Sequence, residues 1–414
     1  MKQRKKTCVG LISGLLYLGL LSGCDCPFFC SDDNGGSKEK YKLAATGEEV
    51  RQFLGVSAAK LVFEEGGSLF FVDFSSDAPE IQKINNADGA VVPCISPDGN
   101  WVTYAKGVTS EGEGGNGSVW ICELSPDAVP IQVAAPGFEP RFVQDAAELT
   151  VIYVTEGGSN LQYGIGKTVK RTVTNGVPGP EVDVFTGGGY VGGLSWDNQY
   201  LSTGFQEGWM ANVTTSVPVQ VHELSFQAQD TAFSDSMISI QVCNSSISSS
   251  RIYTNTMMYI DFGFKNSSYS HGTLSGGQNW DIHEFIFISD YDKKGYKFLK
   301  PPPLPTGTNP GDVITYLWDD PEWSNHPYFA VTNLTLDRIF QEGGSWEHNI
   351  RNEQMYLMDL KNSGQTDVAA LKVVEITETP SLSARTNLQW PWLWVEVPAG
   401  FVEEPGWMGA PFDL

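Results

Sequence analysis

The sequence has little positive charge and few histidines. Its 414 residues include 26 lysines and arginines against 49 aspartates and glutamates, so the net charge is -23 at pH 7, and there are only 5 histidines. Such an acidic surface repels a phosphate backbone, and we expect no nucleic-acid partner. Charged residues make up 18% of the chain, whereas 44 glycines, 23 prolines and 12% aromatic residues favour short strands joined by tight turns.

Motifs for catalysis and metal binding are also missing. The chain contains no Gly-x-Ser-x-Gly elbow, no HExxH, no His-x-His and no pair of CxxC motifs with zinc spacing. Residues 164–168 lack the first glycine of a phosphate-binding loop, and residues 290–295 carry Lys293 where a calcium loop needs a ligand. Both segments are therefore predicted turns. We expect no metal and no cofactor, and a binding protein rather than an enzyme.

Residues 1–23 have the composition of a secretion signal. Four positive charges within the first six residues precede an apolar run, residues 9–21, that is too short for a permanent membrane span. The run ends in Leu21-Ser22-Gly23-Cys24, which resembles a bacterial lipobox. The resemblance implies cleavage before Cys24 and a lipid on its sulfur, and two or three acyl chains would anchor the protein stably to a membrane. An ordinary signal peptide with a chance cysteine is the alternative.

The resemblance predicts a cell-envelope location but leaves the membrane open. Asp25 after the lipidated cysteine resembles an inner-membrane retention signal, while Ser31-Asp32-Asp33 resembles the acidic tag of surface lipoproteins. The periplasmic side of the inner or outer membrane and the cell surface all stay open. Residues 24–57 are predicted to form the lipidated N-terminus and a flexible tether, in which Cys26 and Cys30 are close enough to pair.

Two short patterns recur along the rest of the chain. Residues 70–78 return 50 positions later as residues 120–128, and looser copies occur at residues 356–360 and 285–289. The second pattern, seen at residues 95–102, 194–201 and 321–329, has the composition of a strand, a tight turn and another strand. Repeats of 40 to 50 residues built from short strands indicate a radial architecture.

At these residues the chain resembles the PD40 or TolB-like (WD40-like) β-propeller repeat, whose first strand closes with the Ser96-Pro97-Asp98-Gly99 type of turn. The resemblance implies an all-β fold, a six-bladed β-propeller over residues 58–400, with seven blades as the alternative. The first blade lacks its innermost strand, and residues 388–395 would supply it and close the ring. Residues 401–414 are predicted to form a C-terminal tail. Cys94 and Cys122 fall in apolar strands, where we expect small buried side chains.

Long connections between second and third strands are predicted at residues 106–117, 265–281 and 332–352. They carry the candidate ligand-binding residues His271, Trp280, Trp346 and His348, because aromatic side chains on one face suit sugar rings or a partner protein. The alternative is that Trp280 and Trp346 only hold these loops against the barrel.

Three functions fit these patterns. The first is a non-catalytic envelope lipoprotein, membrane-anchored through Cys24, whose propeller face binds a protein or glycan partner. The second is a TolB-like component of an envelope complex, although TolB has a preceding α/β domain and no lipid anchor. The third is a metal-dependent polysaccharide lyase resembling oligogalacturonate lyase, which requires several histidines to meet in the central channel.

Overall fold

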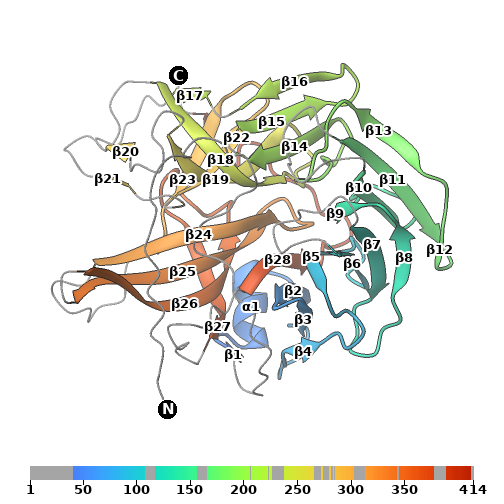
Figure 1. Ribbon diagram of the computed structural model, residues 1–414, viewed down its shortest axis with the longest axis horizontal. Coiled ribbons are helices and arrows are strands. Elements are labelled where there is room, and N and C mark those ends of the chain that lie inside the picture. Colours follow the sequence, from blue (N-terminus) through green and yellow to red (C-terminus); the bar gives the residue numbers. More distant parts are fainter. Residues whose placement is uncertain are drawn as a thin grey trace, which may run out of the picture.

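Six blades of β-strands surround a central axis in the computed structural model, and the fold is a six-bladed β-propeller (Figure 1). Blades four and five are joined into one hydrogen-bonded sheet. The structure describes residues 41–107, 117–155, 166–205, 207–221, 223–225, 237–264, 272–273, 279–280, 283, 285–302, 313–342, 345–376 and 388–411. Within these ranges 28 strands and one helix are present. The predicted all-β fold and the count of six blades are confirmed.

The first three blades each contain four main strands, ordered from the axis outward. Blade one contains β28 (Leu388–Val395), β2 (Ala59–Glu65), β3 (Ser68–Asp73) and β4 (Gln82–Lys83). Blade two contains β5 (Ala90–Ile95), β6 (Trp101–Lys106), β7 (Ser118–Glu123) and β8 (Ile131–Ala134). Blade three contains β9 (Phe138–Phe142), β10 (Thr150–Thr155), β11 (Lys167–Thr174) and β13 (Val182–Thr186), and β12 (Val177–Pro178) also pairs with β11.

The last three blades are less regular. Blade four contains β14 (Tyr200–Phe205), β15 (Glu207–Asn212) and β16 (Val217–Gln220), with Leu194 bridged to Leu201 on the inner side. Blade five contains β18 (Met237–Ile247), β19 (Thr256–Phe264), β22 (Ile286–Asp290) and β23 (Gly295–Leu299), together with the short strands β17 (Glu223–Ser225), β20 (Gly272–Thr273) and β21 (Asn279–Trp280). Blade six contains β24 (Val313–Trp323), β25 (Phe329–Glu342), β26 (Ser345–Asp359) and β27 (Ala369–Ile376).

The recurring sequence patterns fall at equivalent positions of the blades. Residues 70–74 and 120–124 lie in and just after β3 and β7, the third strands of blades one and two, and the looser copies lie in β22 and β26. The second pattern forms the turn between the first and second strands. The Ser96 hydroxyl accepts the Trp101 N–H at 2.9 Å and donates to Asp98, and Ser195 accepts the Tyr200 N–H at 2.9 Å and donates to Asp197. Each serine side chain therefore stabilises its own turn through local hydrogen bonds.

The C-terminal strand closes the ring, as the sequence predicts. β28 pairs antiparallel with β2 over registers from Ala59↔Val395 to Glu65↔Leu388. Leu393 and Val395 are fully buried, and the amide of Asn325 in blade six holds both backbone polar groups of Val395. The innermost strand of blade one thus comes from the far end of the chain, and the ring has no open edge at this junction.

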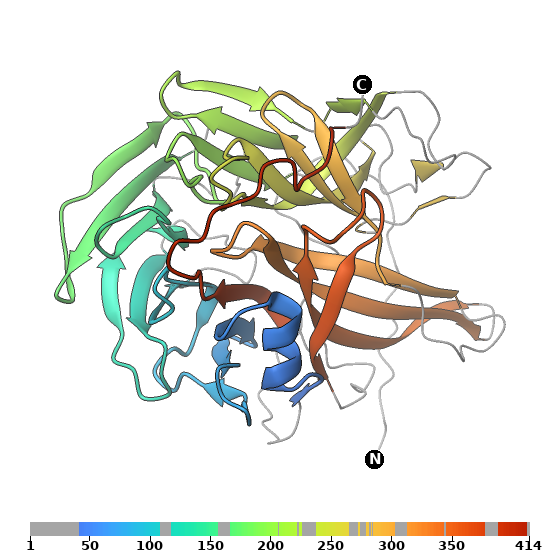
Figure 2. The same cartoon turned by 180° about the vertical axis from the view of Figure 1, so that it is seen from behind.

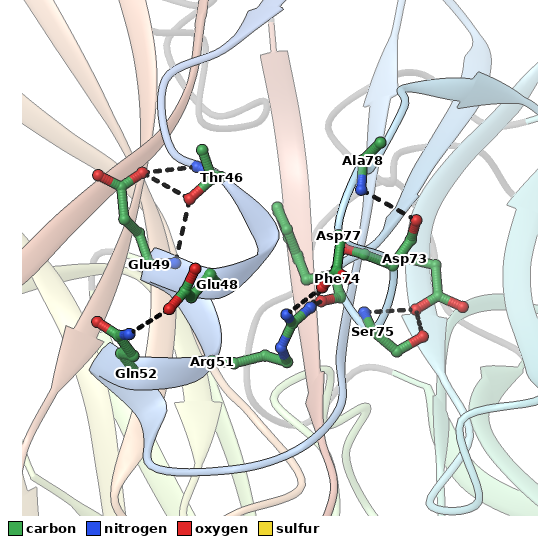
Figure 3. A network of polar contacts seen from close by, with 11 residues as sticks. Thr46, Glu48, Glu49, Arg51, Gln52, Asp73, Phe74, Ser75, Asp77 and Ala78 are labelled. Carbon is green, nitrogen blue, oxygen red and sulfur yellow. Dashed lines mark hydrogen bonds and ion pairs between the residues drawn. The ribbon is translucent and has the colours of Figure 1, made fainter.

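The predicted flexible tether is wrong for residues 41–57, which are folded. β1 (Tyr41–Leu43) pairs with β27 as a fifth strand of blade six, and α1 (Gly47–Leu54) packs beside blade one (Figure 2). Thr46 and Glu49 form a capping box at the start of α1, and the Arg51 side chain donates to the Phe74 carbonyl at 2.6 Å (Figure 3). A Thr-x-x-Glu cap before the buried residues Val50 and Leu54 is typical of a helix start. The tether was predicted from the polar composition of the segment, which does not reveal this cap.

The predicted C-terminal tail packs against the ring on the side seen in Figure 2. The Glu403 carboxylate accepts hydrogen bonds from the Arg251 N–H and the Trp407 indole N–H, both at 2.7 Å, and from Ser250. Trp407 and Met408 are buried against Trp323 and Tyr328. Three residues of the described tail, Glu403, Trp407 and Met408, are therefore buried against blades five and six, whereas Val402 is exposed.

The described residues of the loop predicted at residues 332–352 lie instead in two long paired strands. β25 and β26 have 14 and 15 residues and reach about 48 Å, whereas the six-residue β6 and β7 reach about 20 Å. β27 pairs with β26 only as far as Gln354, so residues 313–319, 333–342 and 345–353 extend beyond it (Figure 1). We call these residues the sixth-blade arm.

Candidate functional site at the mouth of the central channel

The innermost strands of five blades share one irregularity. Each contains a two-residue bulge whose first residue has positive φ, and four of the five bulges end in proline. The first bulge residues are Val92 (φ 54°), Glu139 (φ 49°), Asn244 (φ 46°), Asp320 (φ 43°) and Trp390 (φ 50°). Non-glycine residues rarely adopt this conformation, and a bulge changes the direction of the side chains that follow it.

Side chains that follow these bulges meet near the axis. Arg141 directly follows the third-blade bulge, Glu139-Pro140, and pairs with Glu322 of β24 at 2.5 Å. Its guanidinium carbon lies 5.4 Å from the ring centroid of Trp392 in β28. Arg141 and Glu322 stand 181 positions apart in the chain, and their side chains are only 4% and 5% exposed. Three blades therefore contribute to one buried contact.

Acidic groups outnumber basic groups around Arg141. Burial raises the pKa of Glu139 to about 7, although the neighbouring Arg141 opposes this shift. Burial also raises the pKa of Glu322, against the lowering effect of Arg141, and it raises the pKa of Asp320 together with repulsion from Asp319. One guanidinium thus stands among carboxyl groups that hold their protons more tightly than they would in water.

Asp320 also joins three blades through hydrogen bonds. Its carboxylate accepts from the Asn244 side-chain amide at 2.7 Å and from the Trp390 backbone N–H at 3.0 Å. Asn244, Asp320 and Trp390 are themselves bulge residues of blades five, six and one. The bulges therefore hold the inner strands together as well as directing side chains.

A cavity lies at one end of the channel, beside Arg141. Its interior is small, about 20 Å³, which is room for about one water molecule, and Phe142, Gln144, Gly193, Ile247, Ser249 and Trp392 are among its lining residues. Its lining also includes Leu194 and Ser324, where first strands reach their turns to second strands. We call this end, with the turns at residues 96–100, 195–199 and 324–328, the turn face.

Several buried polar atoms of this lining have no hydrogen-bond partner within the described part of the chain. They are Arg141 Nε, Gln144 Oε1, Ser249 Oγ and Trp392 Nε1. Near the opening, the Arg251 guanidinium stacks 4.4 Å from the ring centroid of Trp196, two residues beyond Leu194. The turn face thus combines hydrogen-bonding groups with an aromatic side chain, a combination common in binding sites.

The candidate residues from the sequence belong to another region. Cys24 and His271 lie outside the described residues. Trp280 pairs with Gly272 in the fifth-blade connection, while Trp346 lies opposite Gln341 and His348 opposite Ile339 in the sixth-blade arm. The side chains of these three residues are also outside the description. Because neighbouring strands are antiparallel, connections between second and third strands emerge on the face opposite the turn face, which we call the loop face.

The two histidines with described side chains occupy separate structural positions. His326 lies in the β24–β25 turn with its ring 4.7 Å from that of Phe401, and His283 precedes β22, where its carbonyl accepts the Trp318 N–H. Burial lowers the pKa of both to about 4. The described residues contain no group of three histidine, cysteine or acidic side chains placed to hold a metal ion.

The described cysteines are structural. Cys94 and Cys122 are free thiols that are fully buried, as predicted, and burial raises the pKa of each to about 12. Such thiols are poor nucleophiles. Across the described ranges, no helix has the length and apolar character needed to cross a membrane.

The turn-face cavity escaped the sequence analysis although its signal is present. The dipeptides Val92-Pro93, Glu139-Pro140 and Asp320-Pro321 each lie two residues before the end of an innermost strand, and Trp390-Pro391 lies four residues before the end of β28. A repeated proline inside a predicted strand indicates a bulge. That recurrence would have directed attention to Arg141, Glu322 and Trp392.

Comparisons with known proteins show similarity of fold. No family model matches the chain, and no curated protein matches it. Among solved structures, the chain is similar to the propeller domain of the Trilobed protease from Pyrococcus furiosus (8% identity, 77% of this chain and 87% of that one, TM-score 0.31) and to the Cps50 (Swd1) propeller domain of Myceliophteria thermophila (8%, 77% and 94%, 0.35). It also matches the Pyrococcus horikoshii acylaminoacyl peptidase (10%, TM-score 0.32), with 76% of this chain aligned and only 48% of that chain spanned.

Proposed function

We propose that this protein is an exported lipoprotein, anchored to a cell-envelope membrane through Cys24, whose propeller binds a protein or glycan partner without chemical turnover. The anchor rests on residues 1–24, whose charge, apolar length and Leu-Ser-Gly-Cys ending all agree. The binding role rests chiefly on the turn-face cavity, where buried polar groups without partners line an opening in a closed ring.

The chemistry of the channel favours binding over catalysis. Arg141 is already paired with Glu322, and the neighbouring Cys94 thiol is held protonated by burial. A rigid scaffold with an unsatisfied polar lining suits recognition, since its groups need no rearrangement when a ligand enters.

Anchoring is tested by Cys24→Ala. Wild type should sediment with membranes, and the variant should appear in the soluble envelope fraction because the acyl chains have no attachment atom. Cys26→Ala is the matched control and should stay with membranes. Retention of Cys24→Ala in the membrane fraction would contradict the lipoprotein proposal.

Partner binding is tested with the purified full-length chain on a glycan array and against solubilised envelope proteins of the producing cells. We expect saturable binding of a discrete partner that weakens in Trp196→Ala and Arg251→Ala. A variant with residues 336–349 replaced by a tight turn shortens the sixth-blade arm on the loop face and leaves the turn face unchanged. Comparing its binding with that of wild type tells which face binds the partner. Turnover of a bound glycan, or no saturable binding in either screen, would overturn the proposal.

A further inference from the structure

The C-terminal tail lies across blades five and six on the turn face (Figure 2). Two tyrosine hydroxyls accept backbone N–H groups of the tail, one from the β18–β19 turn of blade five and one from the β24–β25 turn of blade six. Tyr253 accepts the Gly406 N–H at 3.0 Å, and Tyr328 accepts the Glu404 N–H at 2.7 Å. Both bonds reach the backbone of the tail, so they are available to any peptide that follows the same path. We call the surface beneath the tail the tail site, and its residues are Ser250, Arg251, Tyr253, Trp323, Tyr328 and Lys361.

Trp407 is the most enclosed aromatic side chain of the tail. Its ring centroid lies 5.2 Å from that of Tyr328, 5.6 Å from that of Tyr253 and 6.5 Å from that of Trp323, each in an edge-on arrangement. The residue is only 8% exposed, and its indole N–H donates to the Glu403 carboxylate. An aromatic residue enclosed by other aromatic rings is typical of the few residues that dominate binding at a protein interface.

Three basic residues lie along the tail, although the chain as a whole has a net charge of -23. The Arg251 backbone N–H donates to the Glu403 carboxylate at 2.7 Å, and Lys361 pairs with Glu404 at 2.8 Å. The buried Lys297 ammonium lies 6.0 Å from the ring centroid of Trp407. Acidic groups of a peptide therefore find complementary partners at the tail site on an otherwise acidic protein.

The tail can leave this site without breaking a blade. Its described residues, 396–411, contain no strand or helix and belong to no sheet. Pro398 and Gly400 near its start are exposed, and Gly400 has a φ of 81° with open space around it. Val402 is 80% exposed, so this part of the tail has an outer side that faces solvent. Terminal segments of this kind detach at a lower free energy than the strands of a sheet.

We propose that the tail site binds an acidic, tryptophan-containing segment of a partner protein, and that the tail occupies this site as an internal ligand until such a segment displaces it. The tail shows which chemistry fits, a carboxylate four positions before a tryptophan, as in Glu403 and Trp407. Because the tail is attached, it competes at a high effective concentration, and a partner must bind more tightly or at several points to replace it. This inference rests on the proposed function and narrows its partner to a protein.

The test uses the full-length chain and a fluorescently labelled synthetic peptide of residues 396–411. Fluorescence anisotropy gives the dissociation constant of the peptide for wild type and for Trp407→Ala, whose own tail has lost its enclosed ring. We expect Trp407→Ala to bind the peptide about tenfold more tightly than wild type or better, since a site that is free a tenth of the time weakens apparent affinity by that factor. The same peptide carrying Trp407→Ala should bind about tenfold more weakly to this variant.

Glu403→Ala loosens the tail at a second point and keeps the test valid if Trp407→Ala fails to fold. It should also bind the peptide more tightly than wild type does, because its own tail no longer bonds the Arg251 N–H. Val402→Ala is the matched control, since this exposed side chain lies outside the site, and it should bind the peptide as weakly as wild type. Equal affinity in wild type and both loosened variants, or equal binding of the two peptides, would overturn the inference.

The two proposals fail in different ways. If a glycan or an envelope protein binds saturably in the screens while the peptide binds neither loosened variant, the tail-site inference fails and the binding function stands. If the peptide binds the loosened variants while both screens give no saturable binding, the tail site stands and the proposed function fails.

Discussion

Asn325 should be the strongest single side-chain support of ring closure. It lies 5% exposed in the turn between β24 and β25. Its amide nitrogen donates to the Val395 carbonyl at 2.8 Å, and its amide oxygen accepts the Val395 N–H at 2.7 Å. One side chain therefore pairs both backbone groups of a residue in the closing strand, as a neighbouring strand would.

Asn325→Ala leaves two buried backbone groups without partners. Each unpaired group costs about 1–3 kcal/mol, so we expect the free energy of unfolding to fall by about 2–6 kcal/mol. Urea unfolding followed by tryptophan fluorescence measures the change, and amide hydrogen exchange locates it. Exchange should accelerate first in β28, because among the described strands it pairs with β2 alone and Asn325 holds its last residue.

Asn325→Asp separates the two bonds. An ionised aspartate still accepts the Val395 N–H but opposes its carbonyl, whereas a protonated one can donate to that carbonyl. The loss of stability relative to wild type should therefore shrink as pH falls. Asn100→Ala, in the exposed equivalent turn of blade two, should stay within about 0.5 kcal/mol of wild type. An equally small change in Asn325→Ala, or faster exchange in blade three before β28, would refute this reasoning.

Three further perturbations test the buried polar groups. Arg141→Met should destabilise the fold by about 3–5 kcal/mol by leaving Glu322 unpaired, and Arg141→Met with Glu322→Leu should recover most of that loss in urea unfolding; additive losses would contradict the pairing. Burial raises the pKa of Glu64 from 4.5 to about 8, so the unfolded state releases its proton first and stability falls as pH rises across that interval. Glu64→Gln should flatten the dependence of the free energy of unfolding on pH, and an unchanged dependence would refute the raised pKa of Glu64. Glu403→Ala should lower the free energy of unfolding by about 3 kcal/mol, because the carboxylate no longer holds the Arg251 and Trp407 N–H groups. The tail should then be cleaved by protease near Trp407, and unaltered cleavage would contradict the role of Glu403 in holding the tail.

Local patterns in the sequence were sufficient to predict the blades. Ser96 and Ser195 stabilise their turns by hydrogen bonds to residues at most five positions away. The turns can therefore be predicted from a short stretch of sequence. The third strands repeat because each fills the same place in its blade. Closure followed from one unpaired strand at each end of the propeller. The arm was missed because the segment after Thr332 is long and largely polar, and few of its residues are β-branched.

The candidate site depended on contacts that no local window contains. Arg141 meets Glu322 only because blades three and six both reach the axis, 181 positions apart in the chain. Trp392 belongs to the hydrophobic core, yet its indole N–H lies unpaired in the cavity lining. The sequence analysis chose aromatic residues in long connections instead. Loop position can be predicted from composition, whereas the direction of a side chain toward the central axis cannot.

Closure of the ring and formation of the cavity depend on the same strand. Trp392 contributes to the cavity and stands three residues before Val395, which Asn325 holds in place. Glu322 reaches Arg141 from the strand that ends just before that asparagine. If β28 separates from β2, the cavity loses one wall and Arg141 loses its aromatic neighbour.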